Sequence, residues 1–171
     1  MKNYQIAFVG MGSIGKRHLN NVCQLITSQG NTYSIDLYRS SMTRELSEDV
    51  KDLVANQYLC SQEVQREYDM VFITNPTSLH LDTAIKFRPF TKAFFIEKPV
   101  FSSSDVDENV IALLDEIPSY VACPLRYNPV LQYVKQNVEL EKVVSVRAMS
   151  SSYLPDWRPG QDYRETYSAH T

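Results

Sequence analysis

A doubly wound α/β fold with a mainly parallel sheet is predicted by three features of this 171-residue sequence. Short apolar runs alternate with stretches of helical periodicity as far as residue 123. Each run ends at a glycine, a proline or a polar residue. Within most runs the apolar residues are continuous, as expected for strands covered on both faces. We therefore expect residues 1–123 to form one domain with right-handed crossovers.

The order of elements follows from where the period changes. Strands are expected at residues 6–9, 33–38, 58–60, 69–74, 93–96 and 120–122. Helices are expected from Ser13 to Gly30, from about Met42 to Ala55, between Pro76 and Arg88, and after Ser104. In the first helix, positions 19, 22, 23 and 26 form one apolar stripe.

The pattern changes after Cys123-Pro124. Asn128-Pro129 predicts a helix start, and residues 143–150 alternate in part, as a half-covered antiparallel strand does. Residues 151–171 show no period. We expect residues 124–171 to be the start of a truncated α+β second domain. Its unpaired strand edge predicts association into a homo-oligomer.

Composition excludes several classes of function. Seventeen basic and twenty acidic residues give a net charge of −3 without any basic block, which disfavours nucleic acid as a partner. The three cysteines are far apart and lack metal-ligand spacing, so we expect reduced thiols, a cytoplasmic protein and no metal site. No apolar stretch approaches the length needed to span a membrane.

A glycine motif, Gly10-x-Gly12-x-x-Gly15, follows the first strand and opens the first helix. In this context Gly10 permits a tight turn, Gly12 lets the backbone approach a pyrophosphate, and Gly15 lets helix and strand pack closely. The helix start would offer unpaired N–H groups to the phosphates. The motif predicts a dinucleotide-binding Rossmann domain; the alternative is a strand-to-helix turn that happens to be rich in glycine.

The end of the second strand bears on the choice of cofactor. Asp36 lies inside the strand, whereas Arg39 and Ser40 lie at its carboxyl end, where such sheets bind ligands. An arginine here would receive a 2′-phosphate, so NADP is favoured over NAD. The alternative is that Arg39 is a solvated charge at a strand end.

Two further strand ends carry polar residues. Asn75 and Thr77 could line a cofactor, although helix capping by Thr77 or its neighbour is a common alternative, and His80 fits a structural role as well as a catalytic one. Glu97-Lys98-Pro99 follows an apolar strand. Lys98 could hold a substrate hydroxyl and ease its loss of a proton; the alternative is a surface turn.

These motifs together resemble the Gfo/Idh/MocA oxidoreductases. The resemblance rests on the glycine motif with His18, Asn75-Pro76-Thr77 with His80, Glu97-Lys98-Pro99, residues 126–129 (Arg-Tyr-Asn-Pro) and residues 157–164. Such enzymes use NAD(H) or NADP(H) to oxidise or reduce a hydroxyl or keto group of a sugar, a cyclitol or a nucleotide sugar. The resemblance therefore implies a dinucleotide and a small polyhydroxylated substrate as partners.

The resemblance also implies roles for individual residues. The pyrophosphate would be held by Gly10, Gly12, Ser13, Ile14 and Gly15. The adenosine ribose would meet Arg39 and Ser40, and the cofactor would be flanked by Asn75, Pro76 and His80. The nicotinamide ribose and substrate would be reached by Glu97 and by Lys98, the catalytic candidate. Arg126 would lie where two domains meet, and the substrate would be covered by Trp157, Arg158 and Tyr163.

One departure from the family pattern concerns the catalytic acid/base. Family members continue to an Asp-x-x-x-His element that supplies it, and the sequence ends at His170-Thr171 without a matching element. We therefore expect this chain to bind a dinucleotide while turning over slowly or not at all. The alternative is a non-catalytic dinucleotide-binding or regulatory module. A methyltransferase with a similar glycine loop would leave Glu97-Lys98-Pro99 unexplained.

Overall fold

A computed structural model of the chain describes residues 1–157, 160 and 162–165. The chain divides into two units, Met1–Arg126 and Tyr127–Thr171.

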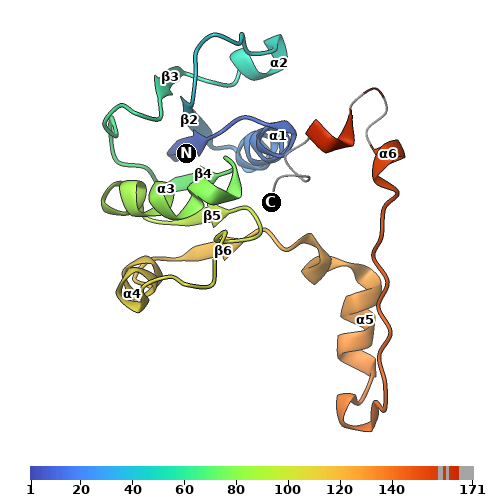
Figure 1. The fold of residues 1–171 in the computed structure, drawn as a ribbon. Helices are drawn as coiled ribbons and strands as arrows, with labels where there is room; N and C mark the ends of the chain where they lie inside the picture. The colour runs from blue at the N-terminus through green and yellow to red at the C-terminus, as the bar shows by residue number, and fades with distance from the viewer. Residues whose placement is uncertain (158–159, 161, 166–171) are drawn as a thin grey trace. The chain divides into compact units, whose positions relative to one another are not determined.

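The first unit contains a six-stranded sheet in which every neighbouring pair of strands is parallel (Figure 1). Its order is β3-β2-β1-β4-β5-β6, so the chain reverses its direction of winding between β1 and β4. The strands are β1 (Asn3–Val9), β2 (Thr32–Arg39), β3 (Asn56–Leu59), β4 (Met70–Ile73), β5 (Phe94–Ile96) and β6 (Ser119–Val121). The predicted doubly wound parallel sheet is confirmed.

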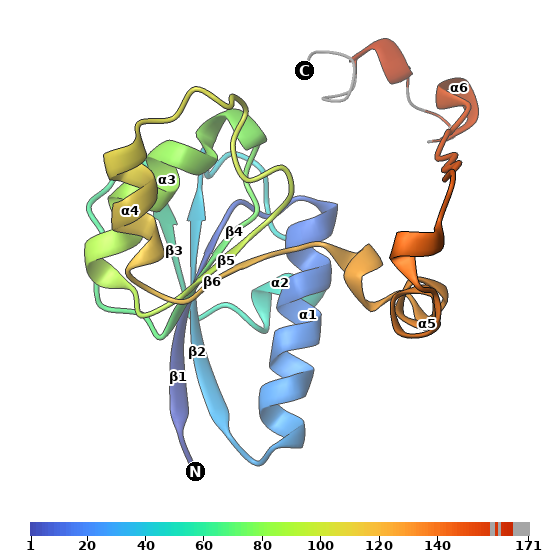
Figure 2. The same cartoon turned by 90° about the horizontal axis from the view of Figure 1, so that it is seen from below.

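Helices cover both faces of this sheet (Figure 2). Alternate residues of β1 point to opposite faces, so Ile6 and Phe8 pack with α1 (Ser13–Ser28) and α2 (Glu48–Lys51), while Ala7 and Val9 pack on the other face. That other face is covered by α3 (His80–Phe87) and α4 (Glu108–Asp115). The continuous apolar runs are explained by burial on both sides.

A row of aromatic rings crosses the α1 face of the sheet. Phe8, Phe72, Phe95 and Tyr120 are register partners on the adjacent strands β1, β4, β5 and β6. Their successive ring centroids are 4.4, 4.9 and 5.3 Å apart. The row fixes the relative positions of four strand ends, because stacked rings resist sliding of one strand past the next.

The region between β2 and β3 differs from the prediction. The expected helix from Met42 to Ala55 is reduced to α2, a single turn. Val50 is buried in that turn, and Leu46, Leu53 and Val54 from the flanking irregular backbone pack against the same cluster. The apolar residues of the segment therefore reach the sheet without a longer helix. Ahead of α3, a 3-10 turn at Thr77–Leu79 delays the start of the predicted helix.

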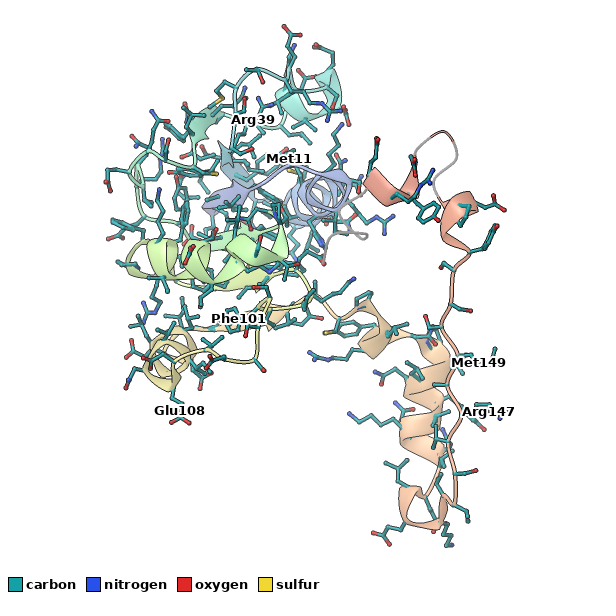
Figure 3. The ribbon with its side chains drawn as sticks, viewed as in Figure 1. Met11, Arg39, Phe101, Glu108, Arg147 and Met149 are labelled. Atoms are coloured by element: carbon teal, nitrogen blue, oxygen red, sulfur yellow. The ribbon has the colours of Figure 1, made fainter. Side chains whose placement is uncertain are left out.

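The second unit begins with α5 (Pro129–Asn137), where the Asn128 side chain accepts hydrogen bonds from the amides of Val130 and Leu131. The strand expected at residues 143–150 is wrong: the structure describes this segment as irregular backbone, and Met149 is exposed on it (Figure 3). A strand needs a hydrogen-bonded partner, and no described residue of this unit supplies one. A short helix, α6 (Leu154–Trp157), follows.

Candidate functional site

Apart from Arg126, the predicted site residues of the first unit lie at the carboxyl edge of the sheet. Since all six strands are parallel, the segments after β1, β2, β4 and β5 leave the sheet on the same side. Figure 3 labels Met11, in the glycine loop after β1, and Arg39, the last residue of β2. The loops after β1 and β4 flank the position where the winding reverses, which is where open α/β sheets bind ligands.

Each glycine of the loop meets a different steric demand. Gly10 has φ +88°, and a Cβ there would lie 2.7 Å from the Asn75 Cα. A Cβ on Gly15 would lie 3.0 Å from both the Gly10 carbonyl oxygen and the Thr74 hydroxyl oxygen. A Cβ on Gly12 would meet no atom within 4 Å. Gly10 and Gly15 are therefore required by packing, whereas Gly12 borders open space.

The start of α1 points its amides at that open space. Gly12 is the residue that precedes the helix, and among the described residues no side chain accepts a hydrogen bond from the amides of the first turn. The first amides of a helix have no partner within it, and the helix dipole adds partial positive charge. Ser13 is exposed and Ile14 is half-buried beside this opening. This arrangement fits a diphosphate group.

At the end of β2, the Arg39 guanidinium has two partners. Its Nη1 donates to Gln57 Oε1 at 2.8 Å, and its Nη2 donates to the carbonyl of Arg44. These bonds hold the group at the sheet edge, on the strand next to β1. Ser40 follows it and is exposed.

A buried hydrogen-bond network around Asp36 was not anticipated. Asp36 accepts from the Tyr68 hydroxyl at 2.9 Å and from Asn56 Nδ2 at 2.8 Å, and it pairs with Arg66 Nε at 3.1 Å. Burial raises the pKa of Tyr68, and its bonds to Tyr38 and Asp36 raise it further. The Asp36 carboxylate is therefore engaged by side chains inside the fold.

Asn75 lies directly after β4 and contacts the glycine loop. Its Nδ2 donates to the Thr83 hydroxyl at 2.8 Å. Its Oδ1 is buried, and no partner for it exists in the part of the chain that the structure describes. A buried acceptor without a donor is costly, so this atom is suited to receive a hydrogen bond from a bound ligand. The next residue, Pro76, is exposed.

His80 is only 1% exposed, and its ring faces the backbone. Nε2 lies 2.9 Å from the Asn75 carbonyl oxygen, while Nδ1 lies 3.0 Å and 3.1 Å from those of Pro99 and Val100. Both ring nitrogens are thus engaged with backbone, which ties the turn after β4 to the turn after β5. Any effect of His80 on a ligand would act through these turns.

The Glu97-Lys98-Pro99 turn follows β5. His18 of α1 lies with Nε2 2.6 Å from Glu97 Oε1, and the Lys98 amide donates to Glu97 Oε2 at 3.2 Å. The Lys98 side chain is exposed. Sequence reasoning assigned no role to His18, although its place three residues after Gly15 puts it on the same helix.

The other predicted residues lie elsewhere. Arg126 is exposed at the end of the first unit, with its guanidinium carbon 5.9 Å from the centre of the Tyr120 ring. In the second unit, Trp157 ends α6, and Tyr163 lies in a 3-10 turn beneath the Arg164 guanidinium. Arg158 lies outside the described residues.

Three other observations concern residues that the structure describes. None of their His, Cys, Asp and Glu side chains form a group of three or more that could hold a metal ion. None of their helices combines the length and apolar character required to cross a membrane. The cysteines Cys23, Cys60 and Cys123 are all unpaired.

Comparison with known proteins matches a family model to residues 4–121, that of the Gfo/Idh/MocA oxidoreductase family with an NAD-binding Rossmann fold. Among solved structures, scyllo-inositol dehydrogenase from Lactobacillus casei with bound NAD(H) and scyllo-inositol superposes with a TM-score of 0.63 at 24% identity, over 78% of this chain and 40% of that one. The WlbA dehydrogenase from Bordetella pertussis with NADH and UDP-GlcNAcA superposes with a TM-score of 0.62 at 21% identity, over 80% of this chain and 42% of that one. This chain thus spans about 40% of the length of these structures. No curated protein gives a significant match.

Proposed function

Because the chain belongs to the Gfo/Idh/MocA oxidoreductase family and contains its NAD-binding Rossmann fold, we propose that it is the cofactor-binding part of an NAD(P)-dependent dehydrogenase. Its substrate would carry a hydroxyl or keto group on a sugar, a cyclitol or a nucleotide sugar. One observation carries the proposal: the uncapped start of α1 borders open space at Gly12, beside the reversal of the sheet. The two solved dehydrogenases described above hold NAD(H) with scyllo-inositol and NADH with UDP-GlcNAcA.

Different residues along the sheet edge would bind different parts of the cofactor and the substrate. The amides after Gly12 would bind the diphosphate, and the buried Asn75 Oδ1 would accept a hydrogen bond from the middle of the cofactor. A bound nicotinamide supplies the hydride acceptor or donor. The exposed Lys98 ammonium would donate a hydrogen bond to the substrate oxygen and stabilise negative charge on that oxygen in the transition state. Glu97 would orient the nicotinamide ribose next to it.

We assign a preference for NADP(H) to the end of β2. Arg39 is already oriented by Gln57 and Arg44, and Ser40 is exposed beside it, so a 2′-phosphate would find a cation and a hydroxyl together. Asp36, the other candidate for a ribose, is occupied in the core. The preference is tested with Arg39→Gln.

In that test the wild-type chain should bind NADPH more tightly than NADH, and Arg39→Gln should remove roughly tenfold or more of the difference while leaving NADH binding unchanged. Lys92→Gln is the matched control, since it removes one positive charge before β5, at the opposite edge of the sheet. Equal affinities for the two cofactors in the wild-type chain would refute the preference.

For the second unit we propose that residues 124–171 begin the substrate domain, with Trp157, Arg158 and Tyr163 covering the substrate. We also propose a homo-oligomer, because α5 exposes Val130 and Tyr133 at 68% and 65%. A cytoplasmic location is proposed from the three unpaired cysteines.

The decisive experiment is a titration of the full chain with NADH and NADPH, followed by nicotinamide fluorescence. Saturable binding by either cofactor supports the proposal. No saturable change at millimolar cofactor refutes it. Turnover assays on a panel of sugars, cyclitols and nucleotide sugars then distinguish a catalytic protein from a module that only binds the cofactor.

A further inference from the structure

We propose that His18 is a positioning residue for the Glu97-Lys98-Pro99 turn, and that it transmits the placement of α1 to the reactive end of the site. The proposal rests on the proposed function, because it assumes that Glu97 and Lys98 face the nicotinamide end of a bound cofactor. His18 itself need not touch the cofactor or the substrate.

The Glu97 carboxylate is held at both oxygens. His18 Nε2 donates to Oε1 at 2.6 Å, since an ionised carboxylate only accepts, and the Lys98 amide donates to Oε2 at 3.2 Å. The Glu97 amide in turn donates to the Ile73 carbonyl of β4 at 3.0 Å. The lysine therefore begins from a backbone amide that is bonded to the same carboxylate that His18 holds.

The imidazole of His18 is itself fixed by the aromatic row. Its ring meets Phe95 edge-on with centroids 4.8 Å apart and lies 6.4 Å from Phe72. The side chains of His18 and Glu97 are 16% and 12% exposed, so their contact is shielded from water yet lies near the surface. A shielded hydrogen bond to a charged group is stronger than one in solvent.

Because His18 lies on α1, its contact with Glu97 links the start of that helix to the Glu97-Lys98-Pro99 turn. The first turn of this helix begins at Gly12, where the diphosphate would bind, and His18 follows in the next turn. One rigid helix thus carries both the phosphate-binding amides and the donor to Glu97. When a cofactor binds at the helix start, the Lys98 turn would therefore already lie at a fixed distance from its diphosphate.

The opposite side of the turn is fixed independently. His80 faces the carbonyls of Pro99 and Val100 from α3, and its ring is buried. This leaves Lys98 between two anchored neighbours, Glu97 and Pro99. Because His80 lies in the core, its loss would disturb the fold as a whole. His18 is the anchor that can be removed with a local effect.

The test measures binding of two ligands to the full chain by isothermal titration calorimetry. ADP reports the adenosine and diphosphate part of the site, whereas NADH or NADPH, whichever binds more tightly, also reports the nicotinamide end. His18→Leu removes the donor, and His18→Gln keeps one. Asn21→Leu, at an exposed position one turn later, controls for adding leucine to this helix.

We expect His18→Leu to bind the reduced cofactor roughly tenfold more weakly, the equivalent of about one hydrogen bond, with ADP affinity unchanged. His18→Gln should recover most of the loss, and Asn21→Leu should match the wild-type chain. If the leucine variant does not fold, His18→Asn replaces it, because its shorter amide stops short of Glu97.

Equal weakening of both ligands would overturn the proposal, since it would mean that His18 only supports the helix. Unchanged cofactor binding in His18→Leu, or a glutamine variant no better than leucine, would overturn it as well. A wild-type chain that binds neither ligand refutes the proposed function instead, and the role of His18 falls with it.

Discussion

Gly12→Asp is expected to change stability and cofactor binding in opposite directions. Gly12 has φ −78° and ψ −171°, an extended conformation open to any residue, and a Cβ there meets nothing within 4 Å. Aspartate is among the best residues to precede a helix, because its carboxylate accepts bonds from the first-turn amides. Those same amides are the ones proposed to bind the diphosphate.

The two magnitudes follow from these contacts. A carboxylate at the start of α1 should raise the free energy of unfolding by about 0.3–1 kcal/mol, equivalent to about 1–4 °C in Tm. Against a phosphate at about 4 Å, the same charge repels by on the order of 4 kcal/mol at an effective dielectric constant of about 20. Cofactor affinity should therefore fall by at least a hundredfold.

The assay pairs urea unfolding, followed by circular dichroism, with calorimetric titration of NADH and NADPH. Asn21→Asp is the matched control: it adds the same charge at an exposed position on α1, away from the loop, and should leave affinity within about twofold. Cofactor binding by Gly12→Asp at wild-type strength would show that the diphosphate does not lie at this helix start. A marked loss of stability would show that the space beside Gly12 is not open.

Three other substitutions test the surroundings of the site by urea unfolding. Gly15→Ala places a Cβ 3.0 Å from the Thr74 hydroxyl oxygen, so it should lower the free energy of unfolding by about 1–3 kcal/mol; a neutral effect would contradict the close packing of loop and strand. Tyr68→Phe removes a donor from the buried Asp36 carboxylate and should cost about 1–3 kcal/mol, whereas no cost would mean that another donor replaces it. For Asp69, burial raises the pKa, but bonds from a backbone amide and a lysine outweigh it, so the pKa lies below its ordinary 3.8. The resulting stability is present above the unfolded-state pKa and is lost as pH falls through the lower folded-state pKa. The free energy of unfolding of the wild-type chain should therefore fall more steeply than that of Asp69→Asn as pH drops below about 4; parallel curves would contradict this.

Most of the parallel sheet was predictable because its signals are local. The apolar run that ends at Gly10 and the stripe through Leu19 and Cys23 each report burial within a few residues. The helix expected from Met42 is much shorter in the structure, although Leu46, Val50 and Leu53 have helical spacing and pack in one cluster. Such spacing shows which residues are buried, but it does not fix how far a helix extends. The strand expected at residues 143–150 failed because alternation does not provide a partner.

The sequence predicted at which edge of the sheet the candidate site residues lie, but it did not predict which side chains contact one another. Strand ends can be read from the chain, so Gly12, Asn75 and Lys98 were assigned to one edge. The contact between His18 and Glu97 spans 79 positions in sequence, and no local pattern encodes it. The burial of Asp36 in a hydrogen-bond network was unpredictable for the same reason, since its partner Tyr68 lies 32 positions away in sequence.

The order of the strands also sets the distances between the candidate site residues. The strands β2, β1, β4 and β5 are consecutive in the sheet. Arg39 is the last residue of β2, and Gly12, Asn75 and Lys98 lie just after β1, β4 and β5. Neighbouring strands are about 4.8 Å apart, so these four residues extend over roughly 14 Å along the sheet edge. A molecule that touches all of them must present, in sequence, a group for a cation, an anion for helix amides, a hydrogen-bond donor and a reactive end. An extended dinucleotide presents groups of these kinds in that order, whereas a mononucleotide has no second nucleoside to serve as the reactive end.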